Sequence, residues 1–341
     1  MLLLLLLLLL SLNSAVYSYQ YRMNRICLND FLASSSSSSD SVNSLIKSIA
    51  VASIDISNTL RVLPLSNLDD SNDIDNQNAS GDQQKPLDVL SNDIMKKYMN
   101  NNVRYIISEE DEKETLCNQS NDLIVAIDPL DGSSNIDCNV ATGTIFGIFK
   151  CNANNNIIDS TNDIIAAGYV LYSSSTEFVL SVGDGTHCFT LDPLSSNYYL
   201  TRKNMLCPSR GIYYSLNEAR SADWPMGLQN YIDDIKNGRG QFKQRYSSRY
   251  ICSMCADLHR TLIYGGWAAN PRYHLRLLYE AKPLAFLTEN AHGKATDGLV
   301  RILDLKAKSY HDRTPLFMGS SEDIDELLSY GDVQQKGNIK Y

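Results

Sequence analysis

One segment places two aspartates, a glycine and two serines directly after an apolar run, and these are the residue types that phosphate chemistry needs. It reads Ala126-Ile127-Asp128-Pro129-Leu130-Asp131-Gly132-Ser133-Ser134-Asn135. Residues 123–127 predict a buried strand that ends at Asp128. Because Pro129 fixes φ and lacks an N–H, we expect the chain to turn there and return Asp131 to the side of Asp128. The glycine and the serine amides and hydroxyls can then face an anion beside metal-binding carboxylates, as metal-assisted phosphate hydrolysis requires.

Other carboxylates stand where metal ligands or proton acceptors could be. Ser108-Glu109-Glu110-Asp111 follows a predicted strand, and three consecutive acids repel one another unless a cation lies there. Glu280 ends an apolar run, and Asp88 lies near the start of a predicted helix, where an acid also suits the helix dipole. Most of the candidate acids also have a purely structural alternative. Residues 109–111 could be an acidic loop in solvent, Asp88 a helix cap, and Asp131 part of an aspartate turn. Since all these candidate ligands are oxygens, Mg²⁺ is the expected ion.

Hydrophobic periodicity indicates a mixed chain of helices and strands. We expect helices over 41–62, 86–99 and 254–264, and strands over 103–107, 123–127, 143–149, 166–172, 177–182 and 300–305. Residues 274–286 are a further apolar stretch, and the Asn-, Asp- and Ser-rich residues 66–83 predict a loop or insertion. This mixture is typical of stacked α/β layers, and a length of 341 residues predicts two subdomains.

The charge balance narrows the class of partner. The formal net charge is −9 and the sequence pI is about 5.1. We therefore expect no nucleic-acid binding, whereas divalent cations suit such a chain. The eight cysteines are scattered over a long chain, which does not indicate a disulfide scaffold.

The combined motifs resemble the class I fructose-1,6-bisphosphatases and, more broadly, the inositol-monophosphatase-like sugar phosphatases. The resemblance covers about residues 41–335 and rests on GDQQKPLDVLSND (81–93), ISEED (107–111), AIDPLDGSSNIDCNVATGTIFGIF (126–149), YSLNE (214–218), RYICSMCADLHRTLIYGG (249–266) and HLRLLYEAKPLAF (274–286). It implies a layered αβαβα sandwich, a homodimer or homotetramer, and hydrolysis of the 1-phosphate of fructose 1,6-bisphosphate in gluconeogenesis or the Calvin cycle. It also implies a metal- and phosphate-binding subdomain over residues 30–205 and a sugar-binding subdomain over residues 206–341.

By position, the resemblance gives each candidate residue a role. Two or three Mg²⁺ ions would be bound by Glu109, Asp128, the Leu130 carbonyl, Asp131 and Glu280. Glu110 and Asp88 match the acids that activate the attacking water. The reacting phosphate would be held by Asp131, Gly132, Ser133 and Ser134. The distal phosphate and the sugar would be held by Asn217, Arg249, Tyr250, Met254, Tyr264 and His274, with the arginine reaching across from a neighbouring subunit.

Three departures from the family pattern fall at the sugar-phosphate end. His274 stands where many relatives have a lysine, Asn270 replaces part of an aromatic segment, and Arg220 stands where many relatives have a tyrosine. Arg220 could supply a bidentate phosphate contact, whereas His274 is a weaker, pH-sensitive replacement. The changes resemble the plastid form that lacks the redox-regulatory loop. They leave open a sedoheptulose-1,7-bisphosphatase, a dual-specificity enzyme, or a non-catalytic paralogue that binds sugar phosphate.

The N-terminus resembles a targeting segment. Residues 2–10 are all leucine and are followed by small residues, as in a signal peptide; they are too few for a membrane span of about 20 residues. Residues 17–29 contain Arg22 and Arg25 but no acid, as in a transit peptide. We expect residues 1–29 to lie outside the fold and to direct the protein to a plastid. The mature protein is expected not to associate with a membrane. A cytosolic protein that starts further along the chain is the alternative.

Overall fold

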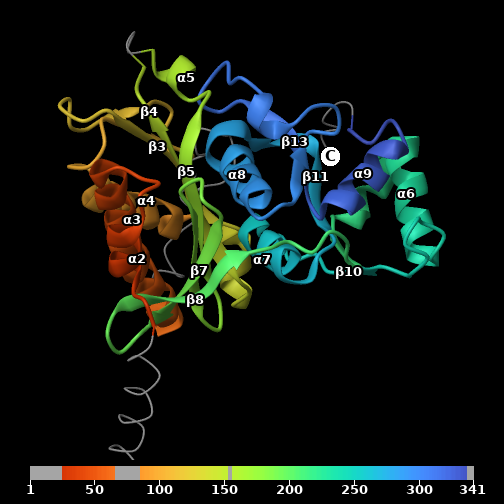
Figure 1. The fold of residues 1–341 in the computed structure, drawn as a ribbon, viewed down its shortest axis with the longest axis horizontal. Helices are drawn as coiled ribbons and strands as arrows, with labels where there is room; N and C mark the ends of the chain where they lie inside the picture. Colours follow the sequence, from red (N-terminus) through yellow and green to blue (C-terminus); the bar gives the residue numbers. More distant parts are fainter. Residues whose placement is uncertain (1–24, 66–84, 153–155, 336–341) are drawn as a thin grey trace, which may run out of the picture.

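The chain folds into five alternating layers of helices and sheets. The computed structural model describes residues 25–65, 85–152 and 156–335. Figure 1 shows, from left to right, a helical layer, an eight-stranded sheet, a second helical layer, a five-stranded sheet and a third helical layer. This arrangement confirms the predicted αβαβα sandwich. Residues 1–24 of the expected targeting segment and the loop expected over 66–83 lie outside the described residues.

The larger sheet contains the strand that leads into the two aspartates. In spatial order its strands are β2 (Thr115–Leu116), β1 (Tyr105–Ser108), β3 (Leu123–Asp131), β4 (Thr142–Lys150), β5 (Ile164–Tyr172), β6 (Thr176–Ser181), β7 (Thr186–Asp192) and β8 (Asn197–Met205). Strands β1 and β3 run parallel, and the other neighbours run antiparallel. Because parallel strands end at the same edge, Glu109 after β1 lies beside Asp128, and its N–H donates to the Ile127 carbonyl at 3.1 Å.

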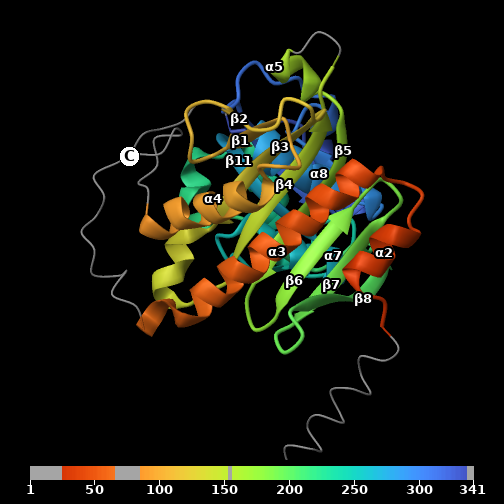
Figure 2. The same cartoon turned by 90° about the vertical axis from the view of Figure 1, so that its left-hand side faces the viewer.

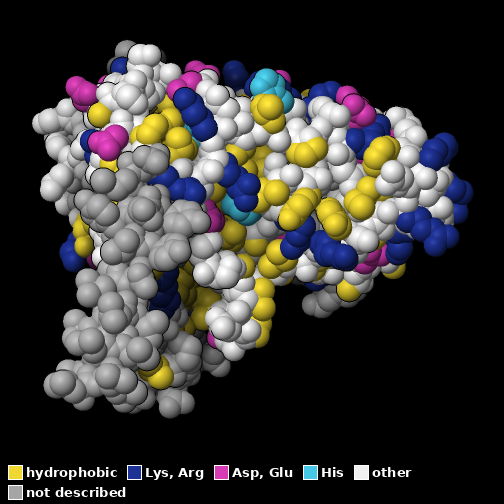
Figure 3. Space-filling view, turned by 60° about the horizontal axis from the view of Figure 1, so that its bottom comes forward, with side chains coloured by type: hydrophobic (Ala, Val, Ile, Leu, Met, Phe, Trp, Pro, Cys, Tyr) yellow, Lys and Arg dark blue, Asp and Glu magenta, His cyan; other side chains and the backbone are white. Residues whose placement is uncertain are grey.

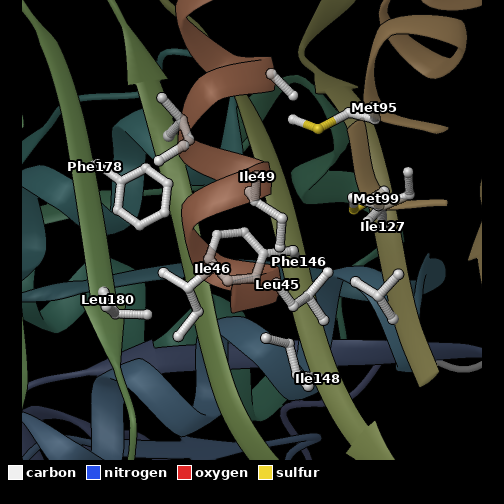
Figure 4. Packing of buried hydrophobic residues seen from close by; sticks show 14 of the residues in the cluster. Leu45, Ile46, Ile49, Met95, Met99, Ile127, Phe146, Ile148, Phe178 and Leu180 are labelled. Atoms are coloured by element: carbon white, nitrogen blue, oxygen red, sulfur yellow. The ribbon is translucent and has the colours of Figure 1, made fainter. Parts of the chain in front are cut away.

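Three helices cover the outer face of the larger sheet (Figure 2). They are α2 (Leu28–Ser34), α3 (Asp40–Val62) and α4 (Pro86–Met99). The α3 helix begins after Ser39, whose hydroxyl accepts the Val42 N–H, and it buries one apolar face. In Figure 4 this face packs on the sheet and on α4, through Leu45, Ile46, Ile49, Met95, Met99, Phe146 and Phe178. The packing positions the first turn of α4 near the end of β3.

The smaller sheet forms the other half of the molecule. Its spatial order is β10 (Ser247–Ser248), β9 (Tyr213–Ser215), β11 (Trp267–Arg276), β13 (Arg313–Gly319) and β12 (Lys294–Thr296). Helices α7 (Met254–Tyr264) and α8 (Lys282–Asn290) lie between the two sheets, while α6 (Met226–Asn237) and α9 (Ser321–Ser329) cover the far face. A short helix, α5 (Ile157–Ser160), precedes β5. The start of α7, in the inner helical layer, therefore lies against the end of β3.

Most of the elements expected from the sequence are confirmed. Helices over 41–62, 86–99 and 254–264 correspond to α3, α4 and α7, and five of the predicted strands correspond to β1 and β3 to β6. The strand predicted over 300–305 is wrong, because Ile302–Asp304 form a 3-10 turn with Ile302 fully buried. The apolar pattern of this segment reflects the burial of Ile302 in a turn and not the alternation of a strand. Strand β8 has mostly exposed polar side chains and so no apolar alternation in the sequence.

The folded part begins before the boundary expected at residue 29. Cys27 forms an isolated bridge with Tyr199, and the Leu200 N–H donates to the Ile26 carbonyl at 2.9 Å. Leu28 is buried at the start of α2. Residues 26 and 27 thus pair with the edge strand β8, and residues 28 and 29 begin α2, so all four belong to the fold.

Charged side chains of both signs cover the end of the molecule that carries α6. Figure 3 shows Lys and Arg side chains gathered there, and the exposed cations of this region include Lys236, Arg239 and Arg245. Lys236 pairs with Glu218 at 2.7 Å, and Arg239 pairs with Asp234 at 2.9 Å.

Within the described ranges, no helix has both the length and the hydrophobicity that crossing a membrane requires.

Candidate active site

A β-bulge brings the two aspartates of β3 to one side of the sheet. Between the paired positions Asp128 and Asp131, two residues of β3 stand opposite Thr144 alone. Residues three apart in a regular strand point to opposite faces, and one extra residue reverses this alternation. Pro129 has no N–H for the ladder, and its carbonyl accepts the Thr144 hydroxyl at 2.8 Å, while the Leu130 N–H donates to Asp128 at 3.0 Å. The turn expected at Pro129 is therefore a bulge within the strand.

The N-terminus of α7 holds the Asp131 carboxylate. The Ser253 hydroxyl donates to it at 2.7 Å, and the backbone N–H groups of Cys255 and Met254 donate at 2.9 Å and 3.2 Å. Unpaired N–H groups and the helix dipole favour a negative charge at this position. Burial raises the pKa of Asp131, and these hydrogen bonds lower it. Gly132 has φ 75°, and a Cβ there would lie 2.9 Å from Ser253 Cβ, so the close approach requires glycine.

A buried arginine, absent from the candidates inferred from the sequence, links two of the carboxylates. Arg276 is 3% exposed, forms an ion pair with Glu109, and places a guanidinium nitrogen 3.6 Å from Glu280. Its backbone N–H also donates to Glu280 at 2.6 Å. Glu280 lies on the π-helical turn Leu277–Ala281, a type of turn frequent at functional sites. The signal in the sequence was an arginine inside an apolar run, because such a residue must be paired when buried.

Four carboxylates face one another around this arginine. Burial raises the pKa of Asp128 well above its ordinary value, and the charges of Glu109, Asp131 and Glu280 raise it further, against the opposing charge of Arg276. The charge imbalance and the oxygen donors suit Mg²⁺. In the part of the chain that the structure describes, no three His, Cys, Asp or Glu side chains are already gathered around one point as a metal site.

Asp88 lies in the first turn of α4, beside the phosphate-binding segment. It accepts the Lys85 N–H at 2.8 Å and is hydrogen-bonded to Ser133. Lys85 Nζ donates to the Ser133 carbonyl at 3.3 Å and pairs with Asp137 at 2.7 Å. Burial raises the pKa of Asp88 to about 6, against the opposing effect of the Lys85 and Ser133 hydrogen bonds. A carboxylate with this pKa can accept a proton near neutral pH.

One cavity of about 530 Å³ brings together most of the residues inferred from the sequence. The inferred residues that line it are Asp88, Glu109, Glu110, Asp128, Leu130, Asp131, Gly132, Ser133, Ser134, Asn217, Tyr250, Met254, His274 and Glu280. Arg220, Asn270, Arg272 and Arg276 also line it. Asp111, the third acid of its run, instead pairs with Lys96 of α4 at 2.5 Å.

Arg249 and Tyr264 lie outside this cavity in the single chain. Arg249 donates to the Ser248 carbonyl at 2.8 Å, and its guanidinium lies 5.5 Å from the centre of the Tyr213 ring. Tyr264 is 63% exposed and packs edge-on against the same ring at 6.0 Å. The fold of one chain therefore does not bring Tyr264 to the expected sugar site. A contribution of Arg249 to a neighbouring subunit stays a prediction.

Comparisons with known proteins agree with this geometry over most of the chain. Residues 23–203 match the family model of the fructose-1-6-bisphosphatase N-terminal domain, and residues 207–332 match that of the C-terminal domain. The chain belongs to the fructose-1,6-bisphosphatase family. The departures at Arg220, Asn270 and His274 line the same cavity as the carboxylates of Glu109, Asp128, Asp131 and Glu280.

Relatives with this family name occur in two plant compartments. The chloroplastic fructose-1,6-bisphosphatase of Brassica napus is 40% identical over 282 residues, which cover 74% of this chain and 68% of the relative. The cytosolic fructose-1,6-bisphosphatase of the same plant is 42% identical over 274 residues, which cover 76% and 80%. The crystal structure of Leishmania major fructose-1,6-bisphosphatase in holo form superposes with a TM-score of 0.84 at 34% identity, over 91% of this chain and 99% of that chain.

Proposed function

We propose that this protein hydrolyses the 1-phosphate of fructose 1,6-bisphosphate, giving fructose 6-phosphate and inorganic phosphate. The observation that supports this most is the clustering of Glu109, Asp128, Asp131 and Glu280 around the segment Gly132–Ser134 in a single cavity. Family membership supports the same substrate. The enzyme is thus a phosphoric monoester hydrolase of carbohydrate metabolism.

The proposed roles follow from the contacts of each residue. Glu109, Asp128, Asp131, Glu280 and the Leu130 carbonyl hold two or three Mg²⁺ ions. When bound, Mg²⁺ neutralises phosphate charge and lowers the pKa of a coordinated water. The amides and hydroxyls of Ser133 and Ser134 hold the reacting phosphate, and the start of α7 keeps the Asp131 carboxylate oriented. Glu110 and Asp88 accept the proton of the attacking water.

Asp88→Asn should lower kcat by about two to four orders of magnitude, the usual contribution of a positioned proton acceptor. The pKa of Asp88 is raised to about 6, so the carboxyl is protonated, and unable to accept a proton, below that pH. On the acidic limb of the pH profile, below the pKa of Asp88, the activity of the wild type should therefore fall about tenfold for each unit of decrease in pH. Nearby cations lower this pKa, so the decline should begin below pH 6. Asparagine does not titrate, so the acidic limb due to this group should vanish in a kcat profile from pH 4.5 to 8.

The folded state should tolerate this change, because asparagine can still accept the Lys85 N–H that caps α4. Equal melting temperatures of the two proteins would verify this. A variant that kept both the wild-type kcat and the acidic limb would refute the role of Asp88.

A direct assay of phosphate release tests the proposed activity. With Mg²⁺ present, purified protein should release phosphate from fructose 1,6-bisphosphate, and EDTA should abolish the release. Sedoheptulose 1,7-bisphosphate should be compared in parallel, because Arg220, Asn270 and His274 alter the cavity where the sugar would lie. A larger kcat/KM for sedoheptulose bisphosphate would change the assigned substrate. Release from neither sugar would favour a non-catalytic protein that binds sugar phosphate.

The remaining proposals concern assembly and compartment. We infer a homodimer or homotetramer, in which residues 30–205 supply the metal and phosphate groups and residues 206–341 supply the sugar groups. We also infer plastid targeting by the N-terminal segment, with the cytosol as the alternative, since the relatives include both forms. A fluorescent protein fused to residues 1–45 should enter plastids, and an evenly cytosolic signal would overturn the targeting proposal.

A further inference from the structure

Two arginines on elements distant in the sequence line the same cavity as the carboxylate cluster. Arg220 lies on the 3-10 turn Glu218–Asp223, and Arg272 lies on β11. Both side chains are only partly exposed. The cavity therefore presents the guanidinium groups of Arg220 and Arg272 in addition to its carboxylate cluster and Arg276.

A bulge in β11 carries one of these arginines. Between its regular pairs with β13, residues 271–274 stand opposite the single Pro315. The bulged segment is held in place, because the Arg272 N–H donates to Asn270 Oδ1 at 3.3 Å and the Gln335 N–H donates to the first carbonyl of the bulge at 3.0 Å. Bulges are frequent beside active sites, where they redirect side chains. Pro315 on the facing strand has no N–H for the ladder, so the bulge lies where the regular pairing is already interrupted.

The two guanidinium groups act on each other electrostatically. Burial lowers the pKa of Arg272, and the charge of Arg220 lowers it further, whereas Tyr250, Cys252 and Asp223 have the opposite effect. Partly buried like charges are unfavourable to the folded protein, and an anion between them would remove that cost. Such arrangements of charge are frequent at functional sites.

We propose that Arg220 and Arg272 together bind the second, non-reacting phosphate of the substrate. This inference rests on the proposed function, and it adds that both cationic donors come from the chain that supplies the carboxylates. A guanidinium can give a phosphate two parallel hydrogen bonds, which a lysine cannot. Arg249 lies outside the cavity of its own chain, so the two arginines would act on this phosphate whether or not a neighbouring subunit adds a third. A substrate with the reacting phosphate alone would lose these contacts.

Arg220→Gln, Arg272→Gln and the double variant test the assignment through binding and through turnover. Binding of fructose 6-phosphate to the metal-free protein is measured by calorimetry, so that this readout needs no catalysis. Each single variant should weaken binding by about tenfold to a hundredfold, the loss expected for hydrogen bonds to a charged group. With Mg²⁺, kcat/KM for fructose 1,6-bisphosphate should fall by a similar factor, and kcat/KM for fructose 1-phosphate should stay unchanged. Arg272→Lys should be intermediate, because it keeps charge without the planar fork.

Two controls separate recognition from folding. Arg202→Gln removes an exposed arginine of β8 outside the cavity and should change neither readout. Removing one of two like charges that act on each other should leave the melting temperature of the ligand-free protein equal or higher, whereas a structural role for Arg272 would lower it and reduce turnover of both substrates together. That pattern would contradict the proposal.

Binding results alone can overturn the proposal whatever the activity. It is overturned if wild type fails to bind fructose 6-phosphate, or if both glutamine variants bind it as tightly as wild type. It is also overturned if Arg249→Gln weakens binding while Arg220→Gln and Arg272→Gln do not, because a neighbouring subunit would then hold the phosphate. If the arginines bind fructose 6-phosphate but no phosphate is released from the bisphosphate, the proposed activity fails and the paired-arginine site stands.

Discussion

Asp131→Asn should lower the turnover of fructose 1,6-bisphosphate by about three orders of magnitude or more, while the protein stays folded. The change removes one of four clustered charges, and charge stabilisation by a bound metal contributes several kcal/mol, at about 1.4 kcal/mol per tenfold in rate. Asparagine keeps one acceptor oxygen for Ser253 and Cys255, and its amide would face only the Met254 N–H, the longest of the three contacts at 3.2 Å. That loss costs about 1 kcal/mol, and relief of the repulsion from Asp128 offsets it.

The matched control is Asp122→Asn, which makes the same substitution next to the start of the same strand. Asp122 is exposed and pairs with Lys150 at 3.2 Å, so its replacement should change activity and stability little. Phosphate release and thermal melts with and without Mg²⁺ are measured on all three proteins. Saturating Mg²⁺ should raise the stability of wild type and of the control, by about 2.7 kcal/mol at a hundred times Kd, but hardly that of Asp131→Asn. A folded Asp131→Asn protein with wild-type turnover would contradict the assignment of Asp131 as a metal ligand.

Gly266→Ala should destabilise the protein by at least about 4 kcal/mol, a loss that few single substitutions reach. Gly266 has φ +87°, and a Cβ there would lie 1.8 Å from the Tyr213 carbonyl oxygen. A backbone atom cannot move aside as a flexible side chain can, so the pairing of β9 with β11 would have to open. The next residue, Trp267, is fully buried and stacks on Tyr214 at 5.6 Å, so the damage would extend into the core.

Gly183→Ala separates backbone strain from steric overlap. Gly183 has φ +95°, like Gly266, but a Cβ there would meet no heavy atom within 4 Å. This control should lose only the cost of a left-handed backbone, about 1–2 kcal/mol. Free energies of unfolding from denaturant titration decide the matter. Equal losses in the two variants would show that the contact with Tyr213 is unimportant.

The residues that carry the chemistry can be predicted from the sequence where they are contiguous or lie at the end of an element. The aspartates, glycine and serines of residues 128–134 lie at the end of β3 and directly after it, so the sequence alone predicts that they act together. The bounds of α4 and α7 also agree with the sequence pattern, because Pro86 opens one helix and Gly265 follows the other. Exposed strands such as β8 escape prediction, since solvent imposes no apolar alternation on them.

By itself, the sequence determined the donor types, the phosphate segment and the layered fold class, because these depend on local order and on hydrophobic periodicity. Tertiary structure alone decided how Asp131 is held, since its donors at the start of α7 lie more than a hundred residues away. It also decided that Arg276 links Glu109 to Glu280, and that Arg220 and Arg272 share one cavity with that cluster. Tyr264, inferred as a sugar contact, lies outside the cavity for the same reason. Contacts between distant segments depend on how sheets, bulges and helix ends pack, and a one-residue bulge, which periodicity does not reveal, is enough to reverse the face on which a side chain lies.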